Sequence, residues 1–308
     1  MAFVAQRVGM DFIGPFLFMS LRMFLGAATL SIVVLLQGFS RKKGKVKPEN
    51  AVVTTESDSN CRNIFSESGV GFKALIKAGF FIGLIVFVAG SLQQVGMVYT
   101  TASKAGFLTA LYIVLVPVMG ITLRHKTYWN TWASVLIAVG GLYFLCITES
   151  FSIRIGDVII LIAALFWACH ILATDHFVVG LSRRDVMKLC ILQFLIAALL
   201  SCICSLIFDR FFEHGVFLLE DFISALPAIL YVGILSTGVA FTLQAIGQQG
   251  INPSAASIIM SLEAVFSVIG GVIILNEILN GREIIGCILM FIALILSQLT
   301  AERKKRPD

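Results

Sequence analysis

Two ionisable residues lie in the middle of long apolar stretches of the sequence. Arg22 falls within 16–38 and Glu263 within 254–276. A charged side chain at the centre of a bilayer costs at least about 2.5–3.5 kcal/mol, so each must face a partner or a cavity. We expect one of two roles. Either Glu263 titrates or binds a cationic group while Arg22 attracts a carboxylate, or the two residues pair with each other or cap backbone groups and hold the helices together.

Five further residues of the apolar stretches are candidates for contact with a polar solute: Gln93, Gln244, Tyr112, Trp167 and His170. An amide side chain donates and accepts hydrogen bonds at once, and Tyr and Trp combine an apolar ring with a polar atom. The alternative for the glutamines is hydrogen bonding between helices, which is worth about 0.6 kcal/mol on average in membranes. The alternative for Trp167 and His170 is simple packing.

The composition excludes a soluble protein. Of the 308 residues, 58% are hydrophobic and only 13% are charged, whereas a soluble domain carries roughly 25% charged residues. The apolar residues come in runs of about 20 without strict alternation, which is typical of membrane-spanning helices and not of barrel strands. We therefore predict an all-α integral membrane protein that contacts the lipid bilayer.

The hydropathy pattern predicts nine full spans, at 16–38, 74–98, 103–123, 129–147, 157–178, 187–207, 223–247, 254–276 and 283–300. Residues 39–73 form the only long polar stretch between them, and we expect this basic segment to be disordered. The first eight residues are too few to cross a hydrocarbon core about 30 Å thick, so we expect a first helix that is truncated in this chain.

Most Lys and Arg residues lie in the loops 39–73, 124–128 and 179–188 and in the tail 301–308. The positive-inside rule places these segments in the cytoplasm, so we expect a multi-pass protein of the inner (plasma) membrane with a cytoplasmic C-terminus. The net charge of +5 therefore indicates topology and no nucleic-acid partner.

The chain resembles itself after a shift of 151 residues. Without a gap, Val88, Ala89, Leu92, Gln93 and Gly96 match Val239, Ala240, Leu243, Gln244 and Gly247, and Tyr112 falls opposite Glu263. The two copies start on opposite sides of the membrane by our orientation, so they are inverted repeats. Such repeats meeting around a site near the midplane are typical of secondary transporters.

Several short segments resemble the EamA-type transporters of the drug/metabolite transporter (DMT) superfamily. They are Phe3-Val4-Ala5-Gln6-Arg7-Val8-Gly9, Pro15-Phe16, Leu21-Arg22, Leu111-Tyr112 with Pro117, Pro253-Ser254-Ala255-Ala256, Leu262-Glu263 and Asn276-Glu277. The resemblance implies about ten transmembrane helices in two inverted five-helix repeats around a central cavity. Here residues 1–150 would form the first repeat, 151–300 the second and 301–308 a basic cytoplasmic tail.

Two departures from the family pattern stand out. Family members usually have a Trp-Gly pair just before the Phe-Val-Ala segment, and they commonly have Pro after Leu-Glu, where this chain has Ala264. The second departure favours a straighter helix at that point.

The function we expect is secondary transport of small metabolites, amino-acid-like or drug-like, by an exporter or facilitator that works by alternating access. A proton or another ion could be the coupling ion. The sequence contains no nucleotide-binding loop and no hydrolase or metalloprotease motif, so we expect no enzymatic activity, no cofactor and no metal site. The alternatives are a non-transporting membrane subunit or receptor and, as the last of the three hypotheses, a membrane-embedded enzyme.

Overall fold

The computed structural model describes residues 2–43, 72–100, 102–122, 129–146, 154–212, 218–263, 265–266 and 281–302. The regular structure within these ranges is helical and includes no strand, which confirms the all-α prediction. The elements are α1 (Ala2–Met10), α2 (Pro15–Lys43), α4 (Phe72–Val98), α5 (Ala102–Ala110), α6 (Tyr112–Thr122), α7 (Trp129–Cys146), α8 (Ile155–Val178), α9 (Arg183–Phe208), the 3-10 turn η3 (Asp209–Phe211), α10 (Leu219–Leu230), the π-helix η4 (Tyr231–Ala240), α11 (Phe241–Gly247), α12 (Pro253–Ser261) and α14 (Gly281–Glu302).

Six helical segments of the described residues are long and apolar enough to cross a membrane. They are Pro15–Leu36, Lys73–Val98, Lys104–Thr122, Ile155–Val178, Arg183–Phe211 and Leu219–Gly247. Each corresponds to one of the predicted spans, which establishes an all-α membrane protein. The other predicted spans contain α7, α12 and α14, and the part of the span 254–276 beyond Phe266 lies outside the described residues. The count of nine therefore stays a prediction.

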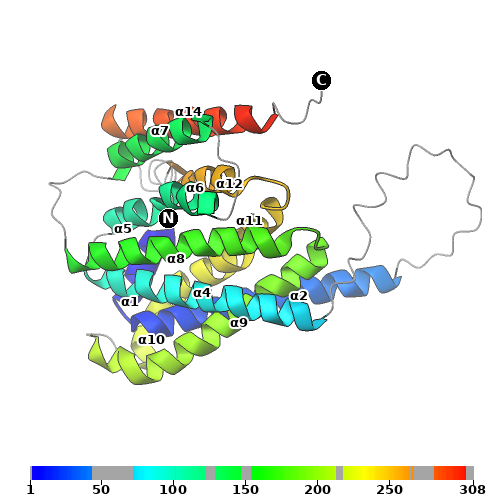
Figure 1. The fold of residues 1–308 in the computed structure, drawn as a ribbon. Helices are drawn as coiled ribbons and strands as arrows, with labels where there is room; N and C mark the ends of the chain where they lie inside the picture. The colour runs from blue at the N-terminus through cyan, green and yellow to red at the C-terminus, as the bar shows by residue number, and fades with distance from the viewer. Residues whose placement is uncertain are drawn as a thin grey trace, which may run out of the picture.

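The helices pack in pairs that are distant in the sequence (Figure 1). α7 lies along α14, α2 lies along α9, and α4 packs against both α8 and α9. Glycine permits close approaches between these helices, since a Cβ atom at Gly156 of α8 would lie only 2.6 Å from the carbonyl oxygen of Gly96 in α4, and one at Gly141 of α7 would lie 3.0 Å from that of Gly286 in α14. These pairs build the frame around the cavity described below.

Apolar cores fill the space between the helices, and two of them are large. One includes Ile113 of α6 and Leu142 of α7. The other includes Met23 of α2, Ile82 of α4 and Phe194 of α9. Large apolar side chains on the outer surface, such as Leu206 of α9, are exposed, as expected for helices that face hydrocarbon.

The predicted span 103–123 is interrupted once, at Leu111 between α5 and α6. There the amide of Leu111 bonds to the carbonyl of Leu108, three residues back, over 3.3 Å. A single tighter turn leaves the apolar pattern unchanged, so hydropathy cannot detect it. The interruption places Thr109 and Tyr112, on its two sides, in the wall of the cavity.

The predicted span 223–247 is one continuous helical segment, in which the π-helix η4 lies between the α-helices α10 and α11. Pro227 lies in α10 and has no amide hydrogen to donate. Phe241, the first residue of α11, donates its amide to Ser236, five residues back. π-Helical turns are rare and frequently occur at functional sites, and here η4 forms one side of the cavity.

The first long helix extends further than predicted. α2 continues to Lys43, so the prediction that disorder begins at residue 39 is wrong over residues 39–43. Helix-forming Arg41, Lys42 and Lys43 continue the helix beyond the apolar part, where hydropathy no longer marks it. Residues 44–71, which make up most of the predicted loop, lie outside the described residues.

Side chains from other segments satisfy the ends of two helices. Arg7 of α1 donates to the carbonyl of Met97 at the end of α4, over 2.8 Å. Gln249, just after α11, donates its Nε2 to the carbonyls of Val178 and Leu181 at the end of α8, over 2.8 and 2.9 Å. The terminal carbonyls of a helix lack partners within the helix, so both contacts hold neighbouring segments together.

Asp209 closes the start of α2 from the other half of the chain. Its carboxylate accepts hydrogen bonds from the amides of Phe16, over 3.1 Å, and Leu17, over 2.8 Å. The side chain is buried, and a Cβ atom at Gly14 would collide with it at 2.4 Å. An acceptor at this position satisfies free amides of the first turn and complements the helix dipole.

We predict that Asp209→Ala destabilises the protein by about 1–2 kcal/mol, because it removes a helix cap and leaves two buried amides without an acceptor. Thermal unfolding of the purified protein in detergent should show a lower melting temperature. Asp11→Ala is the control, since Asp11 is exposed and its ion pair with Arg7, at 3.8 Å, is weak. Equal melting temperatures for the two variants would contradict the capping role.

Candidate substrate cavity

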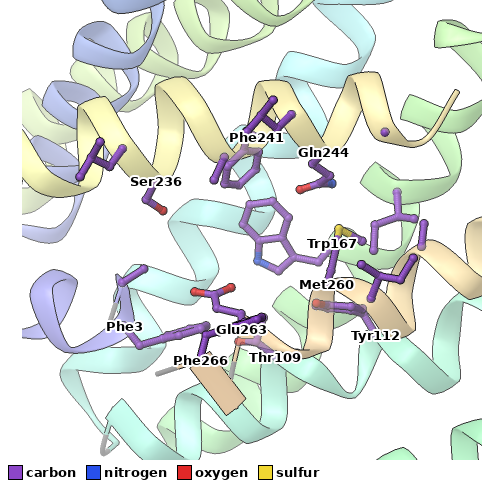
Figure 2. Close-up of a pocket in the computed structure, with 18 of the residues that line it drawn as sticks. Phe3, Thr109, Tyr112, Trp167, Ser236, Phe241, Gln244, Met260, Glu263 and Phe266 are labelled. Carbon is purple, nitrogen blue, oxygen red and sulfur yellow. The ribbon is translucent and has the colours of Figure 1, made fainter. Parts of the chain in front are cut away.

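A cavity of about 680 Å³ lies inside the helix bundle. Its wall includes residues of α1, α2, α4, α5, α6, α8, η4, α11 and α12. Figure 2 shows the Trp167 ring near the middle of this space, with Phe241 and Gln244 on one side and Glu263 and Thr109 on the other. The volume lies in the range of pockets that hold small molecules.

Arg22 is buried in the cavity wall, with 3% of its surface exposed. Its Nη1 donates to Gln6 Oε1 over 2.7 Å, and its Nε contacts Met19 Sδ at 3.1 Å. Its Nη2 has no hydrogen-bond partner. A Cβ atom at Gly90 would lie 3.3 Å from this nitrogen, so the absence of a side chain at residue 90 leaves room for the guanidinium group.

A hydrogen bond joins the two halves of the sequence at the cavity. Trp167 of α8 donates its indole nitrogen to Gln93 Oε1 of α4 over 2.6 Å. Gln93 in turn donates its Nε2 to Gln6 Oε1, at the long distance of 3.5 Å. Arg22, Gln6, Gln93 and Trp167 therefore form one connected run of polar side chains.

His170 lies behind Trp167 and does not line the cavity. Its ring is perpendicular to that of Trp167, with centroids 5.6 Å apart. Its Nε2 lies 3.3 Å from Gln193 Oε1 and 3.4 Å from Thr174 Oγ1, whereas its Nδ1 has no partner. The predicted site residue His170 thus supports the wall from behind.

Glu263, Tyr112 and Gln244 all line the cavity, as Figure 2 shows. The side chain of Glu263 is exposed, and its carboxylate points into the cavity. Neither Glu263 nor Arg22 forms an ion pair with any described residue, so the two charges do not neutralise each other. The cavity wall therefore offers a carboxylate and a guanidinium group that have no ion-pair partner among the described residues.

The structure places six of the seven predicted site residues in the cavity wall, and His170 is the exception. It adds Gln6, Thr109 and Gln248, which the sequence analysis did not select. Gln6 belongs to a helix expected to be incomplete, and Gln248 lies one residue beyond the predicted end of its span. The doubled Gln248-Gln249 so close to an apolar run was the available signal.

Within the described part of the chain, no three His, Cys, Asp or Glu side chains gather where they could hold a metal ion. The polar groups of the cavity wall are instead a guanidinium, a carboxylate, amides and hydroxyls on an aromatic and aliphatic surface. Such a wall binds organic solutes through hydrogen bonds, charge and apolar contact.

Comparison with known proteins identifies the family. The model of the EamA-like transporter family matches residues 154–299. An uncharacterized transporter of Archaeoglobus fulgidus is 32% identical over 225 residues, which cover 72% of this chain and 69% of that protein. The chain belongs to the EamA-like transporter family.

Further relatives of this EamA-like transporter agree over nearly its whole length. The uncharacterized transporter YoaV of Bacillus subtilis is 24% identical over 98% of this chain and 93% of its own. A solved crystal structure, 17% identical, has a TM-score of 0.68 and covers 99% of this chain and 96% of that one. The first likeness concerns the family and the second the fold, and together with the apolar helices they establish a multi-pass membrane transporter.

We predict that Trp167→Phe and Gln93→Leu each destabilise this EamA-like transporter by about 1–3 kcal/mol, because each leaves a buried polar group without its partner. The double variant should lose less than the sum of the two, by about 1 kcal/mol, since it removes both groups together. Thermal unfolding in detergent measures all three losses. Trp129→Phe, at an exposed residue of α7, should leave stability unchanged, and additive losses would contradict the coupling.

Proposed function

We propose that the protein is a secondary transporter of small metabolites in the inner (plasma) membrane, with its C-terminus in the cytoplasm. Its solutes are amino-acid-like or drug-like, and it exports them or lets them equilibrate by alternating access. The observation that carries the proposal is the pair of opposite charges, Arg22 and Glu263, that line one internal cavity without pairing with each other.

The two charges match the two ends of a zwitterion. The buried Arg22, with its Nη2 unpartnered, suits a carboxylate, because a guanidinium offers several donors in one plane. The Glu263 carboxylate suits an ammonium group. Keeping an unpaired ionisable residue inside a membrane is costly, so a ligand that satisfies both charges accounts for their presence together.

The rest of the wall suits the apolar body of such a solute. Aromatic side chains line the cavity from several helices, among them Trp167, Tyr112, Tyr231 and Phe241. The Phe241 ring packs 5.6 Å from Trp167 and 6.1 Å from His170, which holds this part of the wall in place. An aliphatic or aromatic side chain bound here leaves water and gains apolar contact.

We propose the architecture of two inverted five-helix repeats, 1–150 and 151–300, followed by a basic tail, 301–308. The helix packing supports it. The second helix of each half, α2 and α9, pack together, as do the fifth, α7 and α14, and α12 packs against α6. A pseudo-twofold axis through the cavity accounts for such pairs, and alternating access follows from rocking one repeat against the other.

We propose that Glu263 also takes part in coupling to a proton. A carboxylate that binds an ammonium group in one state of the cycle can bind a proton in another, so solute and proton exclude each other. The position of Glu263 in the cavity wall, two residues after the end of α12, is the feature that supports this role.

The test is uptake of L-leucine into vesicles that contain the purified full chain, after a screen of amino acids, nucleosides and polyamines. We predict that Glu263→Gln lowers L-leucine uptake roughly ten- to hundredfold, because a charged hydrogen bond to the ammonium group is lost. The remaining rate should no longer depend on pH. Glu220→Gln is the matched control, since Glu220 is exposed at the start of α10 and outside the cavity.

Two results would contradict the proposal. Unaltered rate and pH dependence in Glu263→Gln would remove this residue from the mechanism. A wild-type protein that binds no amino acid, nucleoside or polyamine and moves none of them would favour the non-transporting receptor or subunit over the transporter.

A further inference from the structure

Three polar side chains of the cavity wall have buried atoms without a hydrogen-bond partner. They are Arg22 at Nη2, Thr109 at Oγ1 and Gln248 at both atoms of its amide. An unpaired polar group is unfavourable in a protein interior. Arg22 and Thr109 lie in the half of the sequence that precedes α8, whereas Gln248 lies in the second half, directly after α11.

Gln248 is the most strongly unsatisfied of the three, because it is only 2% exposed and neither its Oε1 nor its Nε2 is bonded. Its backbone is fixed: its amide bonds to the carbonyl of Gln244 over 2.9 Å. Gly250, with φ +89°, allows the turn that follows. The next residue, Gln249, is bonded to the end of α8. The unpaired amide therefore belongs to an ordered turn.

Gln248 and Glu263 line the same cavity, together with apolar side chains that include Ile251 and Met260. Gln248 comes directly after α11, and Glu263 comes two residues after the end of α12 at Ser261. A solute that fills the cavity can therefore contact both polar side chains.

We propose that Gln248 is a second substrate-binding site of the cavity, which binds a neutral planar amide, a carboxamide or ureido group, at the far end of the solute. This inference rests on the proposed function, in which the charged end of the solute lies at Arg22 and Glu263. A planar amide presents a donor and an acceptor side by side, as the Gln248 side chain does, so the two groups satisfy each other. In the part of the chain that the structure describes, the charged side chains that line the cavity are Arg22 and Glu263, and neither is adjacent to Gln248 in the sequence. A neutral group therefore suits Gln248 better than an ion does.

Two probes of equal length test the site: L-citrulline, which ends in a ureido group, and L-2-aminooctanoate, which carries an alkyl chain of the same number of atoms. Vesicles containing the full chain take up both probes together, and mass spectrometry measures the ratio of their initial rates. We predict that Gln248→Leu lowers the ratio of citrulline to aminooctanoate about tenfold, since the hydrogen bonds to the ureido group are lost. Its melting temperature should stay equal or rise, because the variant removes an unsatisfied buried amide.

Gln249→Leu is the matched control, since it removes an amide from the same turn but outside the cavity wall. It should lower the melting temperature, because the carbonyls of Val178 and Leu181 lose the hydrogen bonds that Gln249 donates, and should leave the ratio unchanged. A wild-type protein that moves aminooctanoate but not citrulline, or an unchanged ratio in Gln248→Leu, overturns the Gln248 site while the proposed function stands. A wild-type protein that moves L-leucine but neither probe overturns the Gln248 site alone, and one that moves no amino acid, nucleoside or polyamine overturns both.

Discussion

The hydrogen-bonded run from Arg22 through Gln6 and Gln93 to Trp167 is the contact on which the rest of the cavity depends. Within a bilayer no water is available, so polar side chains must bond to one another or face an aqueous space. The run joins α1, α2, α4 and α8, and so fixes three helices of the first half against one of the second. At its end, Arg22 Nη2 has no hydrogen-bond partner among the described residues.

Two of the apolar cores combine helices from both halves of the chain. One includes residues of α6, α7 and α14, and the other includes residues of α2, α4 and α9. Beside the cavity, the rings of Trp167, His170 and Phe241 lie within about 6 Å of one another. The halves of the sequence are thus held together by shared apolar packing as well as by the polar run.

Much of this arrangement can be predicted from local sequence, because a helix that crosses a bilayer needs about 20 consecutive apolar residues. The helical class, most helix positions and the cavity residues Arg22, Glu263, Gln93 and Gln244 were predictable from charge and amide groups inside apolar runs. The break at Leu111 was not, since it does not change hydropathy, and the place of Gln248 in the cavity wall depends on the turn after α11. His170 shows what sequence alone does not reveal. A polar side chain within a span can form its hydrogen bond with a neighbouring helix, as His170 does with Gln193. Only the three-dimensional packing shows whether such a side chain faces the cavity.

The π-helix between Tyr231 and Ala240 has a consequence for register. Each residue of an α-helix turns the chain by about 100°, and a π-helical stretch accommodates more residues in each turn, so everything after it is rotated relative to an uninterrupted α-helix. Phe241 and Gln244 face the cavity in that rotated frame. The ungapped match of Gln93 with Gln244 begins at Val88 and Val239, one residue before the last residue of η4. Loss of a single residue within η4 would thus turn the cavity-lining side chains of α11 away from the cavity while leaving the composition of the helix almost unchanged.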